Sequence, residues 1–138
     1  MALVSRSETR QSGAKGDRLA HWKNKFANAL RGILLGIVGQ SSFVVHLSVA
    51  AATLVIAGVL HCPLWQWCVL GLCIGLVLSL ELFNSALEAL AKGLCHEHNP
   101  HVGRALDIAS GAVLIASLTA ALIGVAIFAT QIYPWLFQ

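Results

Sequence analysis

The chain has 138 residues, of which 57% are hydrophobic and only 11% are charged, and its mean hydropathy is +0.76. A soluble domain of this length needs less apolar material for its core, so the composition argues against a soluble protein and favours one integral membrane domain. The positive charge is uneven, because seven of the nine Lys and Arg residues lie within the first 31 positions.

The N-terminal region has two parts. Residues 1–16 are polar without periodicity, so we expect a mobile tail. Residues 17–38 carry apolar side chains every three or four positions: Leu19, Trp22, Phe26, Leu30, Ile33, Leu34 and Ile37. This spacing predicts an amphipathic helix on the cytoplasmic membrane surface, which begins a single membrane-embedded domain of residues 17–138. A helix packed against the other helices on the water side fits the same pattern.

Three later segments have membrane length. They cover about residues 43–60, 64–90 and 108–129, and a spanning helix needs about 20 apolar residues. Pro63 separates the first two, and the polar segment AKGLCHEHNPHVGR separates the second from the third. The fold class is therefore all-α, with an N-terminal surface helix followed by three transmembrane helices.

The basic residues predict the orientation of the chain. The N-terminal cluster and the loop that bears Lys92 and Arg104 are both expected on the cytoplasmic side, since Lys and Arg accumulate there. The N-terminus is then cytoplasmic, and three spans place the C-terminus on the opposite side.

The stretch LELFNSALEALAKG at the end of the second span carries three polar side chains in an apolar context. At 100° per residue, Glu81 and Glu88 lie within about 20° of each other, and Asn84 lies about 60° away, so all three share one helix face. Glu81 is about 26 Å along the helix from Leu64, near the cytoplasmic edge of a hydrocarbon slab about 30 Å thick. We therefore expect a polar stripe that crosses the membrane interface.

A stripe at this depth suits phosphoryl transfer to a lipid. One carboxylate can take a proton from a lipid hydroxyl, while a second, nearer the cytosol, holds the magnesium of a nucleotide. The same residues can instead form hydrogen bonds between helices or extend to water, and spacing alone leaves both interpretations open.

The loop CHEHNPH offers Cys95, His96, His98 and His101 as metal ligands. Clustered histidines in a polar loop are more often solvated, and the four cysteines of the chain have no paired zinc-type spacing. We therefore do not assign a transition-metal site there.

The segment SLELFNSALEAL, followed after a short loop by GRALDIASGAVLIA, resembles the signature of the small prokaryotic diacylglycerol kinase and undecaprenol kinase family. The upstream segments FANALRGI and FVVHL match in the same order, so the resemblance covers roughly residues 26–128. It implies a homotrimer of three-span subunits in the bacterial inner membrane. It also implies transfer of the γ-phosphate of ATP, with Mg²⁺, to a lipid alcohol, either diacylglycerol or undecaprenol.

The resemblance also implies roles for individual residues. Glu81 matches the catalytic base and Glu88 a metal-binding carboxylate, while Asn84 and Ser110 fall near the lipid substrate. The positions that the resemblance assigns to ATP binding are Asn28, Gln40, Glu88, Glu97, His98, Asn99 and Asp107. No P-loop sequence is present in the chain.

Three positions depart from the family pattern. Gln40 stands where a second metal-binding Glu is common, Leu106 stands where a Lys contacts phosphate, and Lys92 stands where Asp is frequent. A neutral Gln oxygen can still bind Mg²⁺, so Gln40 remains a metal and ATP ligand in this interpretation. We further hypothesise that Lys92 supplies the positive charge that Leu106 lacks.

Two functions remain open from the sequence. The first is an ATP-dependent lipid kinase. The alternative is a divergent, weakly active or inactive homologue that acts as a membrane binding or assembly subunit. Small residues at four-residue spacing further predict close helix contacts along the second and third spans: Gly71, Gly75 and Ser79, and Ala112, Ala116, Ala120 and Gly124.

Overall fold

The computed structural model describes residues 21–38, 40–95, 97 and 99–136 of the chain. The chain divides after Val38 into two compact units, and each is considered by itself. The expected tail of residues 1–16 and the first four residues of the expected surface helix lie outside the described residues.

The described part of the first unit is helical over residues 21–37 and ends in a turn at Val38, as the apolar spacing predicts. Trp22 and Phe26, one turn apart, have ring centroids 6.4 Å from each other, and the Lys25 ammonium lies 5.2 Å from the Trp22 ring. The apolar side chains at positions 22, 26, 30 and 34 are all exposed. Placement of this helix on a membrane surface stays a prediction.

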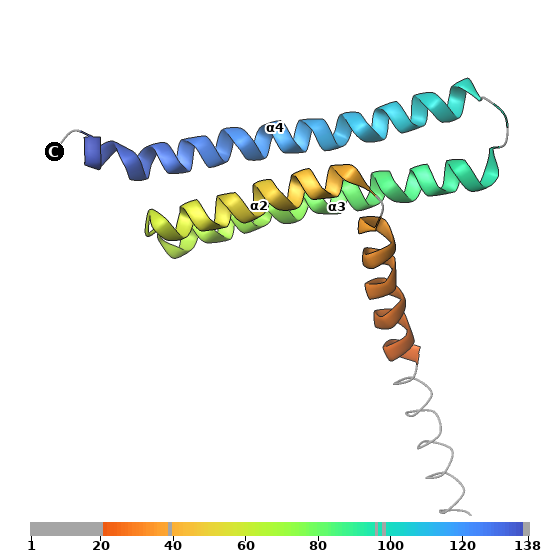
Figure 1. Ribbon diagram of the computed structural model, residues 1–138, viewed down its shortest axis with the longest axis horizontal. Helices are drawn as coiled ribbons and strands as arrows, with labels where there is room; N and C mark the ends of the chain where they lie inside the picture. Colours follow the sequence, from red (N-terminus) through yellow and green to blue (C-terminus); the bar gives the residue numbers. More distant parts are fainter. Residues whose placement is uncertain (1–20, 39, 96, 98, 137–138) are drawn as a thin grey trace, which may run out of the picture. The chain divides into compact units, whose positions relative to one another are not determined.

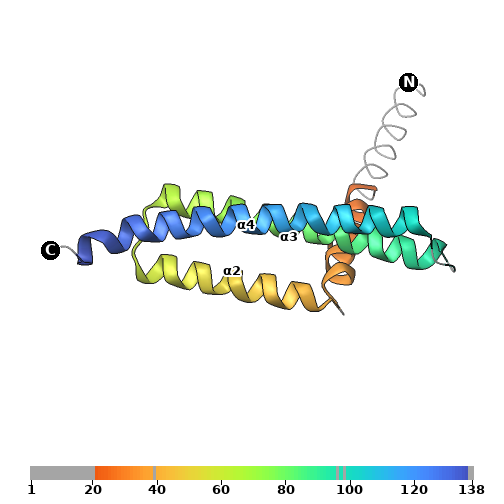
Figure 2. The same ribbon diagram turned by 90° about the horizontal axis from the view of Figure 1, so that it is seen from above.

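The second unit consists of three long helices in its described part, α2 (Ser41–Val59), α3 (Leu64–Leu94) and α4 (Pro100–Leu136). Figures 1 and 2 show the three helices side by side, with α3 antiparallel to both α2 and α4. Helix α3 makes most of its contacts with α4 and fewer with α2. All three helices are long and apolar enough to cross a membrane, which agrees with the three predicted spans.

The turn between α2 and α3 is short, and backbone hydrogen bonds cap the end of α2. The Cys62 amide donates to the Ala57 carbonyl at 3.0 Å and the His61 amide to the Gly58 carbonyl at 3.1 Å. This pair of bonds places His61 in the left-handed region, with φ of 52°, at the position where glycine is most common. Pro63 then precedes the first turn of α3, so the break predicted at this proline is observed.

Helices α3 and α4 extend beyond the predicted spans. Helix α3 runs on to Leu94 and α4 begins at Pro100, so only five residues of the polar segment lie between them. The Asn99 side chain accepts a hydrogen bond from the His101 amide at 3.0 Å and Pro100 takes the first helical position, a combination that starts a helix. At 1.5 Å per residue α3 is about 46 Å long, more than the 30 Å of the hydrocarbon layer.

The core of the second unit lies near the α2–α3 turn. It is formed by Ala57, Cys62, Leu70 and Ile127. Beside it, Gln131 of α4 donates a hydrogen bond to the buried Gln66 of α3 at 3.0 Å. Such bonds between membrane helices contribute about 0.6 kcal/mol on average, so this pair mainly fixes the register of α3 against α4.

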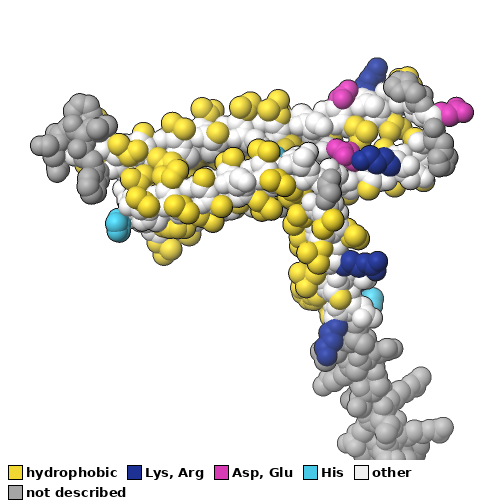
Figure 3. Space-filling model, viewed as in Figure 1, with side chains coloured by type: hydrophobic (Ala, Val, Ile, Leu, Met, Phe, Trp, Pro, Cys, Tyr) yellow, Lys and Arg dark blue, Asp and Glu magenta, His cyan; other side chains and the backbone are white. Residues whose placement is uncertain are grey.

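The outer surface of the helices is largely apolar, as Figure 3 shows for one face. Leu72, Leu76, Leu122 and Val125, for example, are each more than half exposed, which water would disfavour and lipid tolerates. The six charged residues of the second unit all lie between positions 81 and 107. The chain is therefore a multi-pass integral membrane protein, and the charged residues of its second unit lie at one end of the three helices.

The two predicted rows of small residues differ in their surroundings. Within the single chain, Ala116 and Gly124 of α4 are buried, Ala120 is half-buried and Ala112 is exposed. Gly71, Gly75 and Ser79 of α3 are all exposed in it.

Candidate functional site

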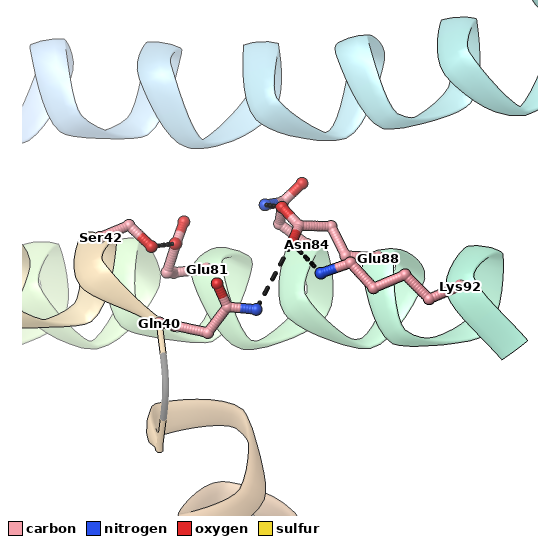
Figure 4. A network of polar contacts seen from close by, with 6 residues as sticks. All are labelled: Gln40, Ser42, Glu81, Asn84, Glu88 and Lys92. Atoms are coloured by element: carbon pink, nitrogen blue, oxygen red, sulfur yellow. Dashed lines mark hydrogen bonds and ion pairs between the residues drawn. The ribbon is translucent and has the colours of Figure 1, made fainter.

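A polar cluster forms where the second half of α3 meets the start of α2 (Figure 4). Glu81, Asn84 and Ser85 are buried in α3, and Glu88 is half-buried one turn further on. Asn84 Nδ2 donates to Glu88 Oε1 at 3.1 Å, so the shared helix face expected from the spacing is observed. The periodicity of α3 thus gathers its two carboxylates in one stripe at the charged end of the helices.

Glu81 is only 4% exposed and is held by two residues of α2. Ser42 Oγ donates a hydrogen bond to Glu81 Oε1, and His46 Nε2 lies 4.0 Å from Oε2. Because a buried carboxylate without partners is costly, these contacts explain how α3 tolerates Glu81 at this depth. Oε1 is thereby occupied, while no hydrogen bond to Oε2 is found within the described part of the chain.

Sequence reasoning missed Ser42 and His46. They are four residues apart and therefore lie on the same face of α2. His46 is the only titratable side chain in α2, and such a residue inside an apolar helix was the signal that could have identified it.

Glu88 lies at the centre of three polar contacts. Besides Asn84, Gln40 Nε2 is 3.4 Å from Oε2, which is long for a hydrogen bond, and Lys92 Nζ is 3.6 Å from the same oxygen. Gln40 immediately precedes α2, yet its side chain makes no capping bond with that helix. Its contact is instead with Glu88, so Gln40 and Glu88 lie together.

The cluster has the chemistry that Mg²⁺ prefers. Glu88 offers carboxylate oxygens, Gln40 an amide that can turn its oxygen toward an ion, and Asn84 Oδ1 is buried without a hydrogen-bond partner. Magnesium usually binds one or two protein oxygens together with nucleotide phosphates and water. Within the described ranges, no group of three or more His, Cys, Asp or Glu side chains is placed to bind a metal ion. The described residues of the cluster therefore fit an ion that is shared with a nucleotide better than one bound by protein ligands alone.

The remaining expected site residues are not joined to this cluster. Asp107 and Ser110 of α4 are exposed, and Ser110 Oγ donates to the Leu106 carbonyl of its own helix at 3.0 Å. Glu97 is exposed, and Asn99 caps α4. Asn28 belongs to the first unit, and His96 and His98 lie outside the described residues.

The fold and the cluster together define an integral membrane protein with a carboxylate-containing polar site at the end of an apolar helical bundle. The family model described as prokaryotic diacylglycerol kinase matches residues 27–128, which is more than half of the chain. The chain therefore belongs to the prokaryotic diacylglycerol kinase family.

Two characterised proteins are similar to this chain. The undecaprenol kinase of Bacillus subtilis is 30% identical over 112 residues, which cover 81% of this chain and 91% of that protein. The diacylglycerol kinase of Synechocystis sp. is 32% identical over 100 residues, which cover 72% of this chain and 57% of that protein. No solved structure gives a significant match.

Proposed function

We propose that this protein is a lipid kinase that transfers the γ-phosphate of ATP to the hydroxyl of a membrane lipid alcohol. The observation that carries this proposal is the pairing of a buried, anchored carboxylate, Glu81, with an oxygen-rich cluster around Glu88 on the same face of α3. Family membership and the names of both relatives support it. The comparisons do not favour the alternative of an inactive binding or assembly subunit.

Glu81 is proposed as the general base. Its Oε1 is engaged by Ser42, so Oε2 is the oxygen that can accept the proton of the lipid hydroxyl. Removal of that proton makes the oxygen a better nucleophile toward the γ-phosphorus. A buried carboxylate held by a neighbouring helix also loses little freedom when the substrate binds.

Glu88, Gln40 and Asn84 are proposed to hold the magnesium–nucleotide complex. When bound, Mg²⁺ neutralises the phosphate charge and fixes the orientation of the transferred group. The protein residues position this complex next to Glu81, because Asn84 lies one turn after Glu81 and donates to Glu88. The ATP-binding roles of Asn28, Glu97, His98, Asn99 and Asp107 and the lipid-binding roles of Glu81, Asn84 and Ser110 remain proposals that rest on the family resemblance.

Lys92 is suited to the compensating role suggested by its position. Its ammonium lies 3.6 Å from Glu88 Oε2, and its side chain is 76% exposed. An exposed pair of this kind contributes little to stability, so Lys92 can leave Glu88 for a nucleotide phosphate at small cost. We propose that it supplies the charge absent at Leu106.

Replacement of Gln40 by Glu is expected to lower the Mg²⁺ concentration for half-maximal activity by about threefold to tenfold, because an anionic oxygen ligand replaces a neutral one. Turnover at saturating Mg²⁺ should change less. A magnesium titration of the wild type and Gln40→Glu measures this directly. An unchanged or higher magnesium requirement in the variant would contradict the placement of Gln40 beside the ion.

The lipid acceptor is proposed to be diacylglycerol or undecaprenol, the lipids in the names of the two relatives. Purified protein in mixed micelles, supplied with γ-labelled ATP and one lipid at a time, tests this choice. Label in the lipid fraction with either alcohol supports the kinase. A folded protein that binds ATP and labels neither lipid would instead favour a binding subunit.

The assembly is proposed to be a homotrimer embedded in the bacterial inner membrane, with the N-terminus and the Glu81–Glu88 stripe toward the cytoplasm. The exposed row of Gly71, Gly75 and Ser79 on α3 supports contacts between subunits, since small residues allow helices to approach closely. Chemical crosslinking in mild detergent should yield trimers. Monomers alone at every protein concentration would contradict the proposal.

A further inference from the structure

His46 of α2 lies next to the proposed base but is too far from it for a direct hydrogen bond. Its Nε2 atom is 4.0 Å from Glu81 Oε2, and a hydrogen bond between N and O atoms needs about 2.7–3.2 Å. One oxygen atom placed to the side of the line that joins the two atoms can lie at hydrogen-bonding distance, about 2.8 Å, from both. A single hydroxyl group or water molecule can therefore bridge His46 and Glu81.

The same histidine lines an apolar cavity between α2, α3 and α4. The cavity has a volume of about 270 Å³, and its walls include Ala50, Leu70, Val77, Ala120 and Gly124. His46 is the cavity-lining residue that is paired with Glu81. A lipid whose hydrocarbon chain enters this cavity would therefore bring its polar end to the gap between His46 and Glu81.

Ser42 completes the arrangement from the same helix. It donates to Oε1 of Glu81, one turn before His46, so the two oxygens of the carboxylate face different partners. Oε1 is fixed by the serine, and Oε2 is left facing His46. This asymmetry selects Oε2 as the oxygen that meets the incoming group.

We infer that His46 and Glu81 together bind the acceptor hydroxyl, with the His46 Nε2–H group donating to its oxygen and Glu81 Oε2 accepting its proton. This inference rests on the proposed kinase function. In the reaction the O–H bond breaks and the proton passes to Oε2. The lipid oxygen then forms a bond to the γ-phosphorus while the bond from that phosphorus to the β,γ-bridging oxygen breaks, and ADP leaves.

The histidine would act on the charge that develops during this step. As the proton leaves, negative charge grows on the lipid oxygen, and a fixed N–H donor at that position stabilises it more than it stabilises the neutral alcohol. His46 is then a catalytic residue that touches the substrate, and Ser42 is a positioning residue that acts through Glu81.

Two replacements of His46 by side chains of similar length distinguish loss of the N–H donor from loss of side-chain volume. His46→Gln keeps an N–H donor and His46→Met removes it. We expect kcat of the Met variant to fall about 100- to 1,000-fold, as when one donor to a developing oxyanion is lost. The Gln variant should stay within about fivefold of wild type, and KM for ATP should be unchanged in both. His61→Asn, in the α2–α3 turn, is the matched control for loss of an imidazole.

The full-length protein in mixed micelles is assayed with undecaprenol and with diacylglycerol in separate arms, and folding of each variant is checked by gel filtration and circular dichroism. Equal losses in the Gln and Met variants, or full activity in the Met variant, would overturn the inference while leaving the kinase function intact. A wild type that phosphorylates neither lipid would overturn the kinase function itself.

A second measurement follows lipid binding to the wild-type protein. In protein with ¹⁵N-labelled histidine, addition of undecaprenol or diacylglycerol without ATP should shift the imidazole resonance that is absent from the spectrum of His46→Gln. Shifts at His46 with at least one lipid support the inference. The absence of a shift at His46 with both lipids, at concentrations that saturate activity, would overturn it.

Discussion

Glu81→Gln is expected to reduce lipid phosphorylation at least about 100-fold, the lower range for loss of a general base. The amide has the shape of the carboxylate and can still accept the hydrogen bond of Ser42, so the helices should remain packed. Only the ability to take a proton is lost. Affinity for the magnesium–nucleotide complex should change little, because the polar partners of Glu81 are Ser42 and His46, whereas Gln40 and Asn84 interact with Glu88.

Steady-state kinetics with varied lipid and varied ATP, combined with a direct nucleotide-binding measurement, tests this expectation. The required result is a fall in kcat with nearly constant nucleotide affinity. Ser48→Ala, on the exposed face of α2 and bonded only to its own helix, is a suitable control. A small loss in Glu81→Gln, no larger than in this control, would show that Glu81 is a structural hydrogen-bonding group.

Glu88→Gln is expected to act differently, through the nucleotide. It removes the only carboxylate of the oxygen-rich cluster around Asn84 and Gln40, so the Mg²⁺ concentration for half-maximal activity should rise about tenfold or more. Binding of ATP in the presence of magnesium should weaken as well. Turnover falls in consequence, and high magnesium should restore part of it.

The two carboxylate variants are expected to differ in their dependence on magnesium. Magnesium titrations of both variants should shift for Glu88→Gln and stay in place for Glu81→Gln. If both variants show the same small loss and neither titration moves, the stripe serves to join helices and not to transfer phosphate.

Much of the fold could be predicted because hydrophobic length and helical periodicity are local properties of the sequence. Runs of apolar residues predicted α2, α3 and α4, and the seven-residue interval between Glu81 and Glu88 placed both on one face. The ends of α3 and α4 were harder, since good helix-forming residues and the Asn99–Pro100 start signal extend the helices beyond the apolar runs.

The contacts between helices could not be predicted from these local properties. Ser42 and His46 meet Glu81 because of the register between α2 and α3, which depends on packing along the whole pair and on the turn at His61. Periodicity fixes the face of a residue on its own helix but not its neighbour on another.

Transfer of the γ-phosphoryl group from ATP to a lipid hydroxyl is tested by measuring both products of one reaction. Purified wild-type protein in micelles that contain diacylglycerol or undecaprenol is supplied with magnesium and ATP, and ADP and lipid monophosphate are quantified by mass spectrometry. We expect equal amounts of the two products with the preferred lipid, and neither product from Glu81→Gln above background. ADP without phosphorylated lipid, or no turnover of either lipid by a folded protein that binds ATP, would contradict it.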